Sequence, residues 1–161
     1  MTHPQPAGEQ QTPELVEMPR RTTAVIKGEV PTEQLPEFFD RSFSRLAATL
    51  AGQGIEPRSA AFALYRGAPT DVARLEVGFV TDDPVEVDDD VVPGRLPRGR
   101  VARMVHQGGY EALGQAWERL ATWVADQGLT AGEVMWEVYL IEPSPDMDPA
   151  ELLTELNLTL A

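Results

Sequence analysis

The sequence of 161 residues contains no cysteine, which excludes disulfide bonds, thiolate nucleophiles and thiolate-ligated metal sites. Histidine is almost absent as well, with His3 near the N-terminus and His106 in the segment HQGGY. A histidine metal centre or a Ser-His-Asp triad would have to be built around His106 alone. The glycine motifs of nucleotide-binding loops are also missing. We therefore expect no metal and no cofactor.

Basic residues are scarce. Lys and Arg number 13 against 26 Asp and Glu, which gives a formal charge of −13. A surface of that charge repels nucleic acid, because nucleic-acid binding needs Lys and Arg at the phosphates. The same field attracts cationic small molecules or a basic protein partner. The acidic run DDPVEVDDD at residues 82–90 is either the contact for such a partner or a solvated connector.

Long apolar runs are lacking too. No segment approaches the roughly 18 apolar residues that a membrane-spanning helix needs, and the N-terminus has no secretory signal pattern. We expect a soluble, cytoplasmic protein without a membrane partner. With 42% hydrophobic residues the chain can bury one ordinary core, so we expect a disordered tail over residues 1–14 and a single domain over residues 15–161.

Hydrophobic periodicity predicts one order of elements twice: a strand, a helix and two further strands. The expected strands and helices cover residues 21–30, 33–52, 60–65 and 73–81, then 100–107, 110–128, 134–143 and 151–160. This order predicts an α+β fold of two β-α-β-β units, about residues 15–82 and 90–161. We expect a pseudo-twofold relation, antiparallel sheets with a helix on each, and a ligand cleft between the units.

An internal duplication supports that arrangement. RLAATLAGQG at residues 45–54 aligns with RLATWVADQG at residues 119–128 at an offset of 74, with six of ten residues identical. The same offset places Ala63 on Glu137 and Tyr65 on Tyr139. Chance similarity between two amphipathic helices is the alternative explanation.

Glu137 is the most unusual residue, because it interrupts the apolar run MWEVYLI. Strand alternation places Glu137 and Tyr139 on one face and Trp136 on the other. Glu137 either faces solvent, or is a partly buried carboxylate beside aromatic rings that suits a lipophilic cation. It could also act as a general acid with a raised pKa.

Other residues complete the candidate site. Glu76 forms a surface ion pair with Arg74, or it converges with Glu137 as an acid and base pair. Tyr110 closes one end of the cleft or packs against the start of the second helix. The candidate ligand-binding residues are Glu137, Tyr139, Trp136, Tyr65, Ala63 and Tyr110, and the candidate catalytic residues are Glu137 and Glu76.

Three segments, VEMPRRTTAVIKGEV, LEVGFV and MWEVYLIEP, resemble the GyrI-like small-molecule-binding domains, which are related to the effector-binding halves of AraC- and MerR-type regulators. The resemblance spans about residues 15–161. It implies a pseudo-twofold α+β fold with an aromatic cleft that holds a carboxylate. Glu137 matches the family glutamate, Tyr139 an aromatic residue near it, and Glu76 an acidic position of the first unit. No helix-turn-helix is expected, so the resemblance does not imply a complete transcription factor.

The resemblance leaves three functions open, since the family includes drug-binding proteins, a gyrase inhibitor and hydrolases of cyclopropane-bearing genotoxins. The first is a free-standing protein that sequesters a hydrophobic, cationic or polycyclic drug-like compound and so confers resistance. The alternative is a cofactor-independent hydrolase that opens strained cyclopropane rings with Glu137 and Glu76. The third is an acidic protein-interaction module, such as a gyrase inhibitor.

Overall fold

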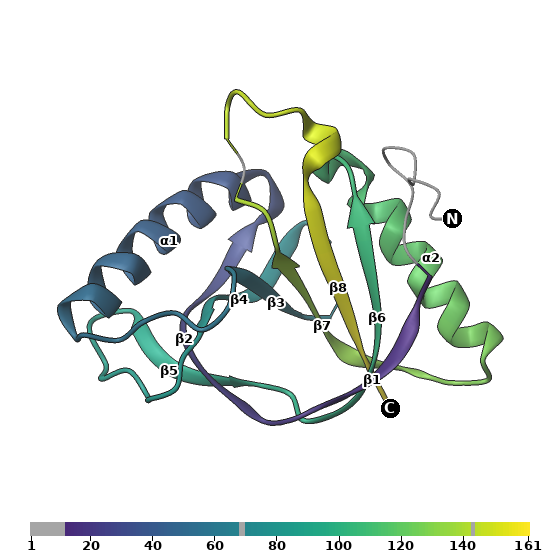
Figure 1. Ribbon diagram of the computed structural model, residues 1–161, viewed down its shortest axis with the longest axis horizontal. Helices are drawn as coiled ribbons and strands as arrows, with labels where there is room; N and C mark the ends of the chain where they lie inside the picture. Colours follow the sequence, from purple (N-terminus) through teal and green to yellow (C-terminus); the bar gives the residue numbers. More distant parts are fainter. Residues whose placement is uncertain (1–11, 68–69, 143) are drawn as a thin grey trace, which may run out of the picture.

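The computed structural model describes residues 12–67, 70–142 and 144–161. Most of the expected tail lies outside these residues, and the first strand begins at Glu14. Within the described residues the chain forms one eight-stranded antiparallel sheet and two α-helices (Figure 1). The strands are β1 (Glu14–Met18), β2 (Arg21–Pro31), β3 (Phe62–Arg66), β4 (Val72–Val80), β5 (Val91–Leu96), β6 (Gly99–Gln107), β7 (Ala131–Tyr139) and β8 (Leu153–Leu160). The helices are α1 (Leu35–Gly52) and α2 (Leu113–Asp126), preceded by the 3-10 turns η1 (Thr32–Gln34) and η2 (Tyr110–Ala112), and a third turn, η3 (Pro149–Glu151), precedes β8.

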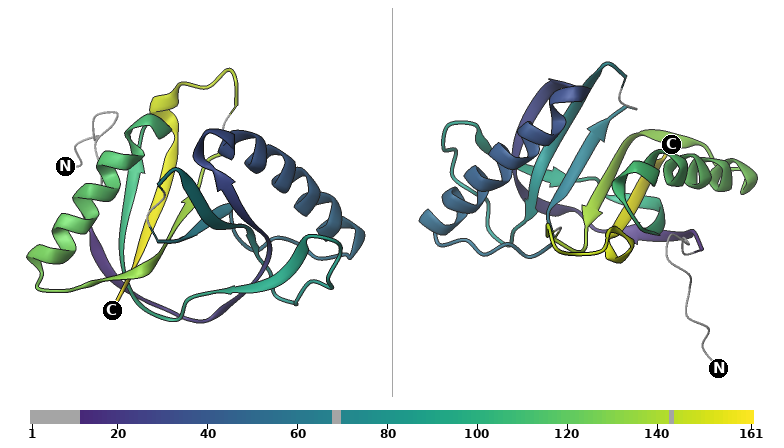
Figure 2. Two further views of the ribbon diagram at one scale, coloured as in Figure 1. Left: turned by 180° about the vertical axis from the view of Figure 1, so that it is seen from behind. Right: turned by 90° about the horizontal axis from the view of Figure 1, so that it is seen from above.

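The predicted order of elements is confirmed, because β2-α1-β3-β4 forms the first unit and β6-α2-β7-β8 the second. The strand order is β1-β6-β8-β7-β3-β4-β2-β5, so the two halves join edge to edge through β7 and β3 into one sheet. Each unit carries its own helix, and seen from above α1 and α2 lie on either side of the central strands (Figure 2). Each helix buries one apolar stripe, built in α1 by Phe38, Leu46 and Leu50.

The strand register supports the pseudo-twofold relation. Where β3 pairs with β7, Ala63 lies opposite Glu137, with Phe62 opposite Val138 and Leu64 opposite Trp136. An offset of 74 residues relates Phe62 to Trp136 and Leu64 to Val138, so it turns one of these pairs into the other. The same offset relates Ala63 to Glu137, so this pair is turned into itself. The pseudo-twofold axis therefore passes through the Ala63 and Glu137 pair.

A two-stranded ribbon also connects the units, on the face of the central strands that points away from the two helices. β1 pairs with β6 of the second unit, and β5, which follows the acidic run at residues 82–90, pairs with β2 of the first. Met18 lies opposite Gly99, and Arg21 lies opposite Leu96. Three steps forward along one segment thus match three steps back along the other, so both ladders share one register. The two crossing segments run along the lower edge of Figure 1. We call residues 17–22 and 95–100 the crossing ribbon.

Three groups of buried side chains hold the fold together. One lies under α1 and another under α2, both on the helix side of the sheet. The third fills the space between the central strands and the crossing ribbon, and includes Phe62, Trp136, Leu96 and Val101. The two faces of β3 and β7 thus point into different cores. No helix of the described ranges is long and apolar enough to cross a bilayer.

Candidate ligand-binding cavity

A cavity of about 1060 Å³ lies between the two units, where β3 meets β7. One wall comes from α1, with Leu35, Phe39 and Phe43. The opposite side comes from the second unit, with Tyr110 and Leu113 at the start of its helix and Tyr139 and Leu140 at the end of β7. The cleft expected between the units is therefore present, and most of its wall is apolar or aromatic.

Glu137 is part of the cavity lining, although only 7% of its surface is exposed. The indole Nε1–H of Trp117 donates to its Oε2 at 2.7 Å, and the hydroxyl of Tyr139 donates to its Oε1 at 2.8 Å. Burial raises the pKa of Glu137 above its usual value, while the two hydrogen bonds and His106 oppose that increase. The site thus holds a carboxylate whose charge is poorly solvated.

Three tyrosines gather around this carboxylate, namely Tyr65, Tyr110 and Tyr139. Burial, and then the charge of Glu137, raises the pKa of each phenol, so all three keep their protons at neutral pH. The rings of Tyr110 and Tyr139 meet edge to face at 5.9 Å between centroids. These side chains present aromatic rings and phenolic oxygens at the cavity wall.

Phenylalanines extend the aromatic surface along α1. The rings of Phe39 and Phe43 stack at 6.2 Å, and Phe43 meets Phe79 of β4 edge to face at 5.8 Å. Phe39 also contacts Tyr139 at 6.4 Å, which joins the two walls. The aromatic lining is therefore continuous from the first unit to the second.

Among the described residues, every charged side chain that lines the cavity is acidic. It consists of Glu137 and, on exposed positions, Asp40 of α1 and Glu142 after β7. No Lys, Arg or His of the described residues lines the cavity. The electrostatic potential inside is consequently negative, which favours a cationic ligand.

Of the six candidate ligand-binding residues, the structure brings four to the cavity: Tyr65, Tyr110, Glu137 and Tyr139. Ala63 lies opposite Glu137 but is fully buried in the core under α1. Trp136 is 1% exposed and packs in the core on the opposite face of the sheet, because neighbouring residues of a strand point to opposite faces.

Glu76 does not converge with Glu137. It lies opposite Leu64, which itself lies opposite Trp136, so Glu76 belongs to the face that points away from the cavity. Its Oε2 accepts a hydrogen bond from Arg66 Nη2 at 2.8 Å. The expected partner Arg74 instead lies 3.7 Å from a carboxylate oxygen of Glu29. The register thus rules out the expected acid and base pair.

Trp117 contacts the candidate site through Glu137 but is absent from the sequence-based candidates, because its helical spacing with Leu113 and Leu120 is typical of an apolar core stripe. An indole N–H needs a hydrogen-bond partner when it is buried, and that requirement was the available signal. His106 is buried behind the site, with Nε2 at 3.1 Å from the carbonyl oxygen of Gly109. No cluster of metal-ligating side chains occurs among the described residues.

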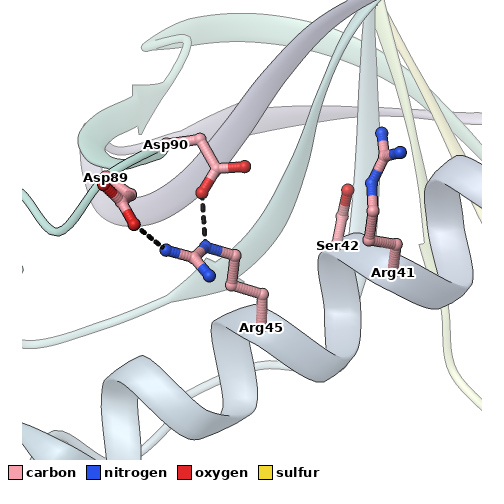
Figure 3. Close-up of a pocket in the computed structure, with 5 residues that line it drawn as sticks. All are labelled: Arg41, Ser42, Arg45, Asp89 and Asp90. Atoms are coloured by element: carbon pink, nitrogen blue, oxygen red, sulfur yellow. Dashed lines mark hydrogen bonds and ion pairs between the residues drawn. The ribbon is translucent and has the colours of Figure 1, made fainter.

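A second depression, of about 560 Å³, lies between α1 and the turn before β5 (Figure 3). Arg45 donates there to Asp89 at 2.6 Å and to Asp90 at 2.5 Å. Arg41 and Ser42 complete the lining. The charges of this depression are largely paired with one another and it lacks aromatic rings, so it is a poor match for a hydrophobic ligand.

The sequence profile of the GyrI-like small molecule binding domain matches residues 11–160. The chain belongs to the GyrI-like family. No curated protein matches this GyrI-like chain in sequence. The small-molecule-binding character of the domain and the resemblance stated above are thereby confirmed.

Solved structures share the fold of this GyrI-like domain at low sequence identity. The C-terminal domain of EcmrR is 19% identical with a TM-score of 0.78, covering 93% of this chain and 97% of that one. In the EcmrR–DNA complex the match, at 20% identity and a TM-score of 0.76, covers 94% of this chain and 57% of that chain. SAV2435, solved bound to tetraphenylphosphonium, is 13% identical with a TM-score of 0.67 and 94% coverage of both chains. A hydrolase from Listeria innocua is 13% identical with a TM-score of 0.65, covering 92% of this chain and 91% of that one.

Proposed function

We propose that this protein captures a bulky hydrophobic cation in the cavity between its two units, with Glu137 as the counter-charge. The observation that carries this proposal is the buried carboxylate of Glu137 in an aromatic cavity whose charged lining is acidic. Capture of such a compound lowers its free concentration, which is the basis of resistance by sequestration.

The dimensions and surfaces suit such a ligand. Cavities of roughly 300–1,000 Å³ hold drug-sized molecules, and this one has about 1060 Å³. Rings of the ligand would pack against Phe39 and Phe43, and burial of apolar surface supplies most of the affinity. The faces of Tyr110 and Tyr139 attract a cation, and the ionised Glu137 adds a direct charge interaction. SAV2435, a structural neighbour, binds tetraphenylphosphonium, which has this chemistry.

The direct test compares two probes of the same shape and opposite charge. Tetraphenylphosphonium and tetraphenylborate are both four phenyl rings around one central atom. We expect the cation to bind at least about tenfold more tightly by calorimetry at pH 8, since the acidic lining repels the anion. Equal affinities, or tighter binding of the borate, would contradict the proposal.

Hydrolysis of a strained ring is a second candidate. The observation that favours it is a carboxyl group with a raised pKa beside the hydroxyl of Tyr139. Protonated Glu137 could donate a proton to the carbonyl oxygen of a conjugated cyclopropane while the ring carbon–carbon bond breaks and its electron pair passes into the carbonyl to form an enol. Water forms the new carbon–oxygen bond and gives one proton back to the Glu137 carboxylate, and the enol then tautomerises to the carbonyl compound. Glu76 takes no part, since it lies on the other face. A product heavier by one water, formed in many equivalents per protein, would establish turnover, whereas stoichiometric loss of free compound indicates capture.

The protein-interaction hypothesis is weakened, because three of the six carboxylates in the acidic run at residues 82–90 form ion pairs within the chain. Asp82 pairs with Arg58, and Asp89 and Asp90 pair with Arg45. We propose no partner for this acidic run.

A further inference from the structure

The crossing ribbon carries a concentration of positive charge that the cavity does not explain. Five of the 13 basic residues of the chain lie in its two short segments: Arg20, Arg21, Arg95, Arg98 and Arg100. Without them the formal charge of −13 would be −18. The excess acidic charge of the molecule is thus carried elsewhere, and the ribbon stands out as a basic surface.

The register of the ribbon brings these arginines together. Met18 lies opposite Gly99 and Arg21 opposite Leu96, and the same register places Arg20 beside Pro97 and Arg98 beside Pro19. Each segment therefore presents a Pro-Arg pair at the middle of the crossing. Two distant parts of the sequence build one surface.

The side chains of these arginines are available. Four of the five are exposed, and Arg21 is half-buried. None of the five forms a side-chain hydrogen bond or ion pair with any described residue, although Glu17 lies opposite Arg100 in the register. Arginines elsewhere do pair, for example Arg45, Arg58 and Arg66. In a chain with 26 acidic residues, unpaired guanidinium groups in one place indicate a binding surface.

The ribbon lies on the side of the central strands that faces away from the cavity. The core beneath it contains Met18 and Leu96 of the ribbon together with Phe62 and Trp136, whereas Tyr65 and Glu137 face the other way. A partner on the ribbon would therefore leave the cavity accessible.

We propose that the crossing ribbon binds an acidic segment of a partner protein. Guanidinium groups form paired hydrogen bonds with carboxylates. Six extended residues span about 20 Å, which matches a short acidic peptide. A nucleic acid duplex extends well beyond that length and would meet the acidic remainder of the surface, so a peptide is the better fit.

The experiment measures fluorescence anisotropy of a labelled hexaglutamate peptide at 50 mM and 300 mM NaCl. Arg20→Gln combined with Arg98→Gln should weaken binding by roughly tenfold at low salt. The matched control combines Lys27→Gln with Arg119→Gln, which changes the net charge equally at exposed positions outside the ribbon. The control should change affinity by less than about twofold, and higher salt should weaken binding to the natural protein.

Several results would overturn the proposal: no binding of the peptide, an equal loss in the control, or tighter binding of single-stranded hexathymidine than of hexaglutamate. Arg95→Gln combined with Arg100→Gln provides a second test if the first pair fails to fold, and it should show the same loss. Both pairs should retain the melting temperature of the natural protein, because the substituted side chains are exposed.

Discussion

Replacing Glu137 by glutamine tests the role of its charge with the least change of shape. Glutamine keeps the volume and can still accept a hydrogen bond from Trp117, but it carries no charge. The variant therefore separates the charge of the cavity from its hydrophobic surface.

The expected loss follows from the Coulomb interaction. Two unit charges about 5 Å apart interact by roughly 3 kcal/mol at an effective dielectric constant of about 20. Desolvation of the ligand cation opposes part of that energy, so we expect Glu137→Gln to weaken tetraphenylphosphonium binding by about 10- to 100-fold. Neutral triphenylphosphine oxide should bind both proteins within about threefold of each other, because it carries no charge to lose.

Calorimetry at pH 8 is the assay, since burial raises the pKa of Glu137 and a higher pH favours its ionised carboxylate. The matched control is Glu142→Gln, which removes the same charge from an exposed position of the lining and should cost less than about threefold. An unchanged affinity for the cation in Glu137→Gln, or an equal loss for the neutral probe, would refute the electrostatic role.

Four further predictions concern Glu137, its hydrogen-bond donor Trp117 and the buried Ala63 opposite it. Because burial raises the pKa of Glu137, tetraphenylphosphonium affinity measured across a pH series should fall as the pH decreases, with a midpoint above the ordinary glutamate value of about 4.3; a flat profile would argue against Glu137. Without ligand, the folded carboxyl keeps its proton to higher pH than the unfolded one, so its contribution to stability is full at low pH and lost as the pH rises through the folded pKa. The melting temperature of Glu137→Gln should accordingly rise relative to the natural protein over that window, and a shift in the opposite sense would contradict the assigned direction. Trp117→Phe removes a donor to the carboxylate, so the midpoint of the binding profile should move to higher pH, whereas Trp123→Phe should leave it in place. Ala63→Trp overpacks a fully buried position and should lower the free energy of unfolding in urea by about 1–3 kcal/mol, and normal stability would place Ala63 outside the core.

Local sequence patterns predicted much of the fold. The aligned segments at residues 45–54 and 119–128 indicated two related units, and each ends at a glycine with a positive φ, Gly54 at 70° and Gly128 at 74°. Alternation within β7 correctly placed Glu137 and Tyr139 on one face, as their hydrogen bond shows. These predictions depend only on residues close together in the chain.

The parts that failed depend on pairing between distant segments. Alternation within β4 shows which residues share a face with Glu76, but only the register through β3 shows that this face is opposite to that of Glu137. The exchange of β1 and β5 between the units is likewise a long-range pairing, and Pro93 and Gly94 in β5 weaken its local strand signal. The hydrogen bond of Trp117 could not be predicted either, because its partner Glu137 lies on a different element of the second unit.

The most direct test of cation capture between the two units is a crystal structure of the complex with tetraphenylphosphonium. The predicted result places the phenyl rings against Phe39 and Tyr110, with the phosphorus atom within about 6 Å of the Glu137 carboxylate. Ligand density at the depression beside Arg45, with the cavity unoccupied, would contradict the account.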